Sequence, residues 1–269
     1  MNIMTLIGKP ALGVLAYYRG QETIVHICAV YPNSDNSLEL HFPNGHGLRR
    51  GDSATIHLDN RTGVADYDAE LRVFRMSYKG TVVTGDDRSV ILRLRECQIY
   101  YSNRIELDLR QPGYVYPPDN RPETALALSS LQRLPTPDAK EHDNKVGVLV
   151  TMAPEQPHTT VLAFLSSEDG DVFFVTLPDS YKARLLRRNP HCFFAIDSRA
   201  SFSFDRALEW NYSIIEADAT LIPSATPLFE TIREAFIAKN PWEIAFFTLP
   251  NLEMYHLKSA GVVCPGAAR

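Results

Sequence analysis

Residues 172–190 read VFFVTLPDSYKARLLRRNP, an order of letters that predicts a strand, a turn and a helix. The apolar run VFFVT predicts a buried strand that ends at Thr176. A short turn containing proline follows, and a helix is expected to begin at Asp179 or Ser180, with Lys182 in its first turn. This strand–turn–helix unit is the starting point for interpreting the rest of the chain.

The start of the expected helix has the chemistry of an anion site. The first N–H groups of a helix are unpaired and carry the positive end of its dipole. Hydroxyl groups at Thr176 and Ser180 add donors and the Lys182 ammonium group adds charge, which suits a phosphomonoester. A plainer interpretation stays open, in which Asp179 caps the helix and its basic side chains form a solvated face: Lys182, Arg184, Arg187 and Arg188.

Strands dominate both sides of this unit. In the second half, apolar runs predict strands at 146–152, 159–165 and 191–197, a long strand or pair of strands at 208–222, and a helix at 225–239; IAFFTLP and MYHLKSAGVV finish the chain. In the first half, 11–19 and 22–31 flank Gly20-Gln21 as a hairpin, and further strands are expected at 37–42, 53–58, 69–77, 80–84, 89–94 and 104–109. Many short strands with Gly, Asn and Asp between them predict a small antiparallel barrel or sandwich.

A proline-rich segment separates the two halves. Residues 111–122, QPGYVYPPDNRP, lack packing residues and predict a linker. The following segment, 123–134, places leucines on one helical stripe and predicts a short helix. We therefore expect a small β-barrel domain at 1–115 and a second domain at 116–269, with no internal repeat.

Composition excludes several classes of function. The chain has 269 residues, a formal net charge of −5 and 45% hydrophobic residues, so nucleic acid is not the expected partner. No apolar run is long enough for a spanning helix, and no membrane association is expected. The cysteines, Cys28, Cys97, Cys192 and Cys264, do not have metal-ligand spacing. No metal site is expected, and free thiols favour a cytoplasmic location.

The order of elements in 146–197 resembles the pyridoxamine 5′-phosphate oxidase-like FMN-binding split-barrel family. The matching letters are T-x-x-x-S-x-K at Thr176, Ser180 and Lys182, followed by L-x-x-N-P at Leu185 and Asn189-Pro190. The resemblance covers roughly residues 123–260. It implies a mainly β (α+β) chain, with a C-terminal split β-barrel and flanking helices after the first barrel. Residues 51–83 resemble, faintly, the small barrel that precedes PilZ domains.

The resemblance also implies a cofactor site. In that family FMN lies at a homodimer interface. Lys182 would be the phosphate cation, with Ser180 and Thr176 as phosphate or ribityl donors. The strand residues His158, Thr159, Thr160 and Val161 would lie along the ribityl chain and ring edge. Trp210 and Tyr212 would border the flavin, unless they are core aromatics.

Two departures bear on the substrate. The oxidase has an arginine and a lysine where this chain has Thr160 and Leu165, and its C-terminal Trp and Arg motif has no counterpart here. Pyridoxamine 5′-phosphate is therefore not the expected substrate. The resemblance implies an FMN-dependent oxidoreductase whose small-molecule substrate and electron donor are open. The alternative is a non-catalytic haem- or ligand-binding sensor on the same scaffold, in which His256 would be the axial ligand.

Overall fold

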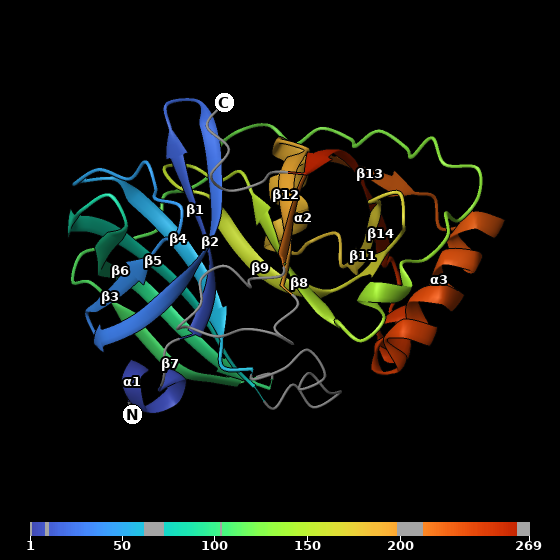
Figure 1. The fold of residues 1–269 in the computed structure, drawn as a ribbon. Coiled ribbons are helices and arrows are strands. Elements are labelled where there is room, and N and C mark those ends of the chain that lie inside the picture. The colour runs from blue at the N-terminus through green and yellow to red at the C-terminus, as the bar shows by residue number, and fades with distance from the viewer. Residues whose placement is uncertain (1, 9–10, 62–72, 103, 198–211, 263–269) are drawn as a thin grey trace.

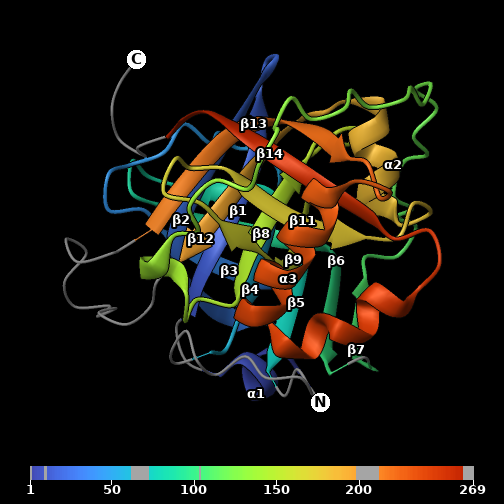
Figure 2. The ribbon, with the colours of Figure 1, turned by 90° about the vertical axis from the view of Figure 1, so that its right-hand side faces the viewer.

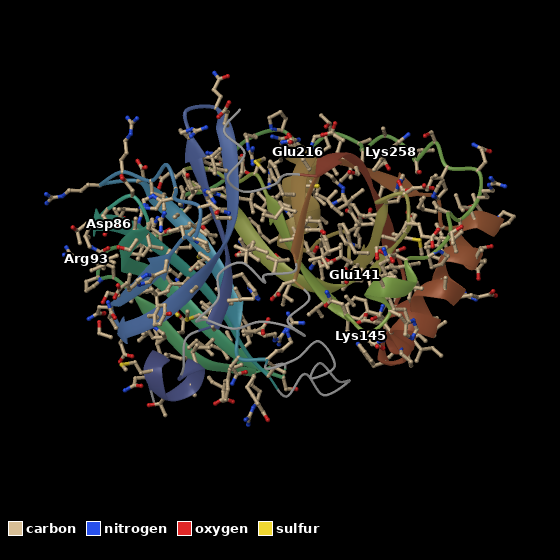
Figure 3. All side chains as sticks on the ribbon, in the orientation of Figure 1. Asp86, Arg93, Glu141, Lys145, Glu216 and Lys258 are labelled. Carbon is tan, nitrogen blue, oxygen red and sulfur yellow. The ribbon has the colours of Figure 1, made fainter. Side chains whose placement is uncertain are left out.

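Two β-barrels lie side by side in the computed structural model, with the first half of the chain in one and the second half in the other (Figure 1). The structure describes residues 2–8, 11–61, 73–102, 104–197 and 212–262. Among these residues, no helix is both long and apolar enough to cross a membrane. Charged side chains such as Asp86 and Arg93 point outward from the first barrel (Figure 3).

The first barrel is closed. A short helix, α1 (Ile3–Ile7), precedes strands β1 (Ala11–Arg19), β2 (Glu22–Ser34), β3 (Ser37–His41), β4 (Ser53–Asp59), β5 (Phe74–Gly85), β6 (Ser89–Tyr101) and β7 (Arg104–Arg110). The strand order is β3-β2-β1-β4-β5-β6-β7, and pairing of β3 with β6 closes the ring. Leu15, Tyr17, Ile56 and Tyr78 fill its core. The predicted antiparallel barrel is confirmed, with 80–84 as part of the longer β5 rather than a separate strand.

The second barrel is a split barrel, as predicted. Its elements are a 3-10 turn (Ala139–Glu141), β8 (Val146–Thr151), β9 (His158–Ala163), β10 (Leu165–Ser166), β11 (Val172–Thr176), α2 (Tyr181–Arg188), β12 (His191–Asp197), β13 (Tyr212–Ile222), α3 (Pro227–Lys239), a 3-10 helix (Pro241–Thr248) and β14 (Glu253–Val262). The strand order is β10-β11-β14-β13-β12-β8-β9. Figure 2 shows α3 across the outside of this barrel, where Ile232 and Phe236 pack against Phe173 and Met254.

The barrels share an apolar joint. Leu12, Val14 and Ala16 on β1 pack in one cluster with Val148 and Val150 on β8. Polar contacts lock the same joint. The Tyr18 hydroxyl donates to the Ala153 carbonyl at 2.7 Å and accepts from its N–H at 3.0 Å. Because both barrels bury apolar surface there, the joint is part of the core rather than a flexible contact.

The segment between the barrels, residues 111–137, packs on both of them, and we call it the strap. The guanidinium carbon (Cζ) of Arg95, on the first barrel, lies 4.5 Å from the centre of the Tyr114 ring. Further along, Ser129 donates its N–H to the Leu221 carbonyl, and the Leu221 N–H donates to Ala127. The strap therefore has packing partners, which its composition does not predict.

The predicted helix at 123–134 is wrong, because this part of the strap is extended. Its backbone hydrogen bonds go to β13 and to the end of α2 instead of to its own residues. Its leucines pack on the second barrel, Leu126 in one cluster and Leu131 and Leu134 in another. The tertiary contacts outweigh a weak helical preference, which the central Ser129-Ser130 lowers further.

Candidate functional site

Helix α2 begins where the sequence predicts. Ser180 is its N-cap and accepts a hydrogen bond from the Ala183 N–H at 3.3 Å. The Ser180 hydroxyl also lies 3.1 Å from the Thr176 hydroxyl at the end of β11. Asp179 is exposed and is not the cap. The strand end and the helix start thus bring the two predicted hydroxyl groups together.

The basic side chains of α2 do not behave alike. Arg184 and Arg188 both form ion pairs with Glu123, and Arg187 forms one with Glu253. Lys182 is different, because no hydrogen bond or ion pair involves its ammonium group within the part of the chain that the structure describes. Burial lowers the pKa of this lysine. A desolvated cation without a counter-ion has a strong preference for an anion.

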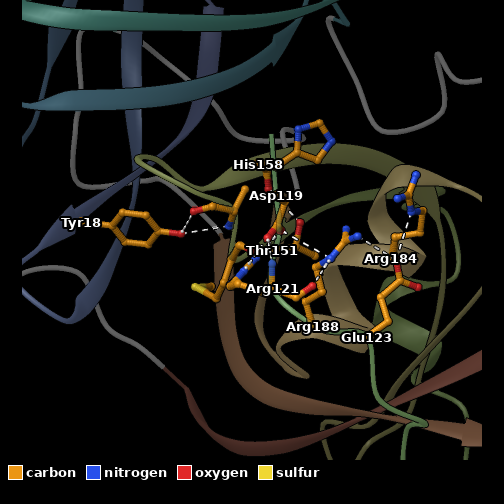
Figure 4. Close-up of polar contacts among 10 residues, drawn as sticks. Tyr18, Asp119, Arg121, Glu123, Thr151, His158, Arg184 and Arg188 are labelled. Atoms are coloured by element: carbon orange, nitrogen blue, oxygen red, sulfur yellow. Dashed lines mark hydrogen bonds and ion pairs between the residues drawn. The ribbon is translucent and has the colours of Figure 1, made fainter. Parts of the chain in front are cut away.

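A polar network fixes the position of α2 (Figure 4). Arg188 lies 2.8 Å from Glu123 and donates through Nε to the Arg121 carbonyl at 3.0 Å. Arg121 pairs with Asp119 at 2.7 Å and donates to the Met152 carbonyl at 2.7 Å. The strap therefore ties the C-terminal end of α2 to the end of β8.

His158 points from β9 toward the start of α2. Its Nε2 atom lies 3.1 Å from the Thr160 hydroxyl, and its ring is 4.9 Å from the Tyr181 ring, edge to face. Burial, together with the nearby positive charges of Lys79 and Lys182, lowers the pKa of His158 to about 3. The imidazole is therefore neutral at physiological pH. Its Nδ1 atom is buried and has no partner among the described residues.

Two of the predicted β9 residues, Thr159 and Val161, lie on the opposite face of the strand from His158. Thr159 is buried, and its hydroxyl has no hydrogen-bond partner in the described ranges. Val161 lines the cavity at the joint between the barrels. By alternation, His158 and Thr160 face the start of α2 while Thr159 and Val161 face the first barrel.

The first barrel supplies residues that sequence reasoning missed. Lys79 on β5 is buried and donates to Glu96 at 2.5 Å, and its Nζ lies 4.7 Å from the centre of the Tyr116 ring. Tyr116 in turn lies 6.3 Å from Tyr181 at the start of α2. No sequence signal joins Lys79 to His158, since their proximity depends on how the barrels dock.

The remaining predictions fall elsewhere. Trp210 lies outside the described residues, and Tyr212 begins β13 with a side chain that is not described. His256 is 1% exposed, and both its ring nitrogens have partners, at 2.8 Å from the Ser129 hydroxyl and 2.9 Å from the Asp171 carboxylate. Neither nitrogen is therefore open to a haem iron. No group of three or more candidate metal ligands occurs in the described part.

No protein-family model and no curated protein matches this chain. Solved structures do match it, over a little under half of its length. HutZ, the haem storage protein from Vibrio cholerae, is 18% identical, and the match covers 46% of this chain and 89% of that one, with a TM-score of 0.40. A putative pyridoxamine 5′-phosphate oxidase from Listeria innocua is 21% identical over 46% of this chain and 90% of its own, with a TM-score of 0.32. An FAD-binding protein from Mesorhizobium loti is 16% identical over 44% and 82%, with a TM-score of 0.35.

Proposed function

We propose that this chain is an FMN-binding flavoprotein, an FMN-dependent oxidoreductase of the pyridoxamine 5′-phosphate oxidase-like superfamily that acts on a small molecule in the cytoplasm. One observation carries the proposal. The half-buried Lys182 lies in the first turn of α2, directly after the paired hydroxyls of Thr176 and Ser180, and has no counter-ion among the described residues. A phosphate monoester supplies the charge and the acceptors that these groups lack.

The residues present fit such a cofactor. Lys182 and the α2 N–H groups would hold the phosphate, and Ser180 and Thr176 would donate to it or to the ribityl chain. The unpartnered Nδ1 atom of His158 offers a further polar contact from β9. Bound FMN supplies hydride or electron transfer. The protein's part is to hold the cofactor and to keep a neutral, uncharged imidazole beside it.

The same geometry argues against pyridoxamine 5′-phosphate as the substrate. Leu165 is 3% exposed and belongs to the apolar cluster under α3, so that position presents no charge to a ligand. Thr160 is engaged with His158. The second phosphate that such a substrate carries therefore lacks cations at the positions where the resemblance expects them.

A haem-binding sensor is the second candidate, and one observation favours it. The neutral His158 imidazole has a buried nitrogen with no partner in the described part of the chain, which suits an axial metal ligand. In this candidate His158 replaces His256, because both nitrogens of His256 are hydrogen-bonded.

An absorbance spectrum of the freshly purified protein separates the candidates. A two-band yellow spectrum, with FMN released by heat, is the expected result. A Soret band that is lost in His158→Ala would favour the haem sensor instead. A colourless protein that binds neither added FMN nor added haemin would overturn both.

A further inference from the structure

The two barrels repeat one strand order. In the first, β1 pairs with β2 and β4, β4 with β5, β5 with β6, and β6 with β3. In the second, β8 pairs with β9 and β12, β12 with β13, β13 with β14, and β14 with β11. The strands β1, β2, β3, β4, β5 and β6 correspond, in that order, to β8, β9, β11, β12, β13 and β14. With this correspondence, each of the strand pairs named for the first barrel has its counterpart in the second. Strand β10, which directly follows β9, completes the correspondence by pairing with β11.

The repeat also matches in register. Val14 on β1 has one partner on β2 and one on β4, and Val148 on β8 has one partner on β9 and one on β12. Both strands carry the letters GVL at this place, at residues 13–15 and 147–149. The matched pairs around these valines are Gly13 with Gly147, Val14 with Val148, and Ile27 with Val161.

The matched residues meet at the joint. All six line one small cavity between the barrels, which has room for about one water molecule. Asp59 and Asp197, the last residues of the matched strands β4 and β12, line the same cavity and are buried. Contact between the same positions on two copies is the signature of a two-fold interface. The joint is therefore arranged as a pseudo-two-fold interface inside one chain.

The candidate site occurs on one side of this pseudo-symmetry only. Ile56 on β4 and Phe194 on β12 are matched residues, so their cross-strand partners on β5 and β13 are matched as well. Lys79 and Glu216 each follow such a partner by one residue and are therefore matched positions. A cation on one side thus corresponds to an anion on the other. Figure 3 shows Glu216 at the top of the second barrel.

The other components of the site are also missing from the first barrel. His158 on β9 corresponds to Ile24 on β2, because the two pair with the matched residues Thr151 and Tyr17. Helix α2 corresponds to residues 42–52, all described, which contain no helix. An anion site of the kind that Lys182 forms therefore has no second copy in the described part of this chain.

We propose that the first barrel takes the place of a second copy of the split barrel, so that one chain holds one complete anion site between its own barrels and functions as a monomer. Lys182 and His158 come from the second barrel, and Lys79 and Tyr116 come from the first barrel and the strap. The inference about the ligand rests on the proposed function, whereas the internal pairing does not. The competing arrangement is the homodimer that the family resemblance implies.

Two measurements on the full chain test the proposal. Light scattering of the purified protein, without added cofactor, is expected to give the mass of one chain. Titration with FMN is expected to saturate at one FMN per chain. Lys79→Gln is expected to weaken FMN binding at least tenfold with the mass unchanged, and Lys79→Arg is expected to restore most of it. Arg93→Gln, an exposed change on the same barrel, is the control and keeps wild-type affinity.

The outcomes are distinguishable. A mass of two chains would overturn the internal pair. A monomer that binds FMN equally well with Lys79→Gln would overturn the contribution of the first barrel. Because Lys79→Gln also removes the Glu96 ion pair, its thermal unfolding must show a folded protein; if it is unfolded, Tyr116→Leu replaces it in the titration, with the same expected loss. A monomer that binds no FMN at all would overturn the proposed function and leave the internal pair standing.

Discussion

The Nδ1 atom of His256 lies 2.8 Å from the hydroxyl oxygen of Ser129, and this contact ties the strap to the interior of the second barrel. The Asp171 carboxylate accepts a hydrogen bond from Nε2 at 2.9 Å, so the proton belongs on Nε2 and Nδ1 accepts from the serine. The ring also stacks on Phe173 at 5.1 Å. The imidazole is thus held from three sides.

Ser129→Ala is expected to loosen the strap. The change removes the short hydrogen bond to Nδ1 of a buried imidazole and leaves only the Thr220 hydroxyl, at 3.4 Å, near that atom, which costs about 1–3 kcal/mol. Urea unfolding measures the loss, and faster hydrogen exchange at the Ser129 amide locates it. Ser130→Ala is the matched control, because Ser130 is exposed and its side chain makes no hydrogen bond among the described residues. Equal stability of the two variants would contradict the anchoring role of Ser129.

Stability is expected to fall in mild acid. Burial, with smaller contributions from the neighbouring His46 and Arg19, lowers the pKa of His26 to about 4; burial also lowers the pKa of His158 and of His256. Below pH 6.5 the unfolded chain binds protons that the folded chain does not, so the free energy of unfolding decreases as pH falls from 6.5 toward 4. For His26 the shift corresponds to about 3 kcal/mol at most.

Urea unfolding at a series of pH values measures this slope. His26→Leu is expected to flatten it, since the apolar side chain binds no proton in either state. His41→Leu, at an exposed histidine of the same barrel, is expected to leave the slope in place. A wild-type protein whose stability is constant between pH 7 and pH 4.5 would contradict the assignment of buried neutral histidines.

Lys182→Ala is expected to weaken FMN binding strongly. Loss of a charged hydrogen bond costs about 1.5–3 kcal/mol, or roughly a tenfold to 150-fold change in Kd. Arg184→Ala, on the exposed side of the same helix, is the matched control because its guanidinium group pairs with Glu123. Fluorescence quenching of FMN gives both values. Similar affinities for the two variants would remove Lys182 from the phosphate site.

Lys239→Met is expected to stabilise the protein below neutral pH. The Lys239 side chain is 4% exposed, its Nζ lies 3.5 Å from the centre of the Phe164 ring, and burial lowers its pKa to about 7. The unfolded chain therefore takes up this proton at a higher pH than the folded chain does. As a result, the free energy of unfolding decreases as the pH falls from 10.5 to about 7, and below that it stays lowered by the full amount. Nearby Glu141 and Lys145, labelled in Figure 3, act on this pKa in opposite directions.

The expected gain for Lys239→Met is about 2–4 kcal/mol at pH 6, and it shrinks as the pH approaches 10. Thermal unfolding at pH 6 and pH 9.5 measures the difference. Lys140→Met, an exposed change in the same region, is expected to alter neither value. A Lys239→Met protein that is less stable than wild type at pH 6 would show that the buried ammonium group has a stabilising partner.

Local patterns in the sequence predict most elements of the fold. The hairpin across Gly20-Gln21, the helix start at Ser180 and the second helix all follow from turn residues, caps and apolar spacing, and each is found. The helix predicted at 123–134 fails because its backbone partner, Leu221, is far away in the sequence. Contacts at such a distance leave no local periodicity.

The candidate site also has one part that the local sequence predicts and one part that it does not. Thr176, Ser180 and Lys182 lie within one strand–turn–helix unit, so their spacing alone predicts that they meet. Lys79 and Tyr116 reach the site only through the docking of the barrels, and the internal repeat is visible only in strand order and register. Its trace in the sequence is little more than GVL at two places, which is too short to detect.

The opposite charges at Lys79 and Glu216 have a genetic consequence. In an assembly of two identical subunits, one codon specifies both halves, so any substitution alters two symmetric positions at once. A pair of barrels encoded in tandem is free of that restriction, and each half accumulates its own changes. In this chain the matched positions differ in charge, with Lys79 on β5, which pairs with Glu96, and Glu216 on β13.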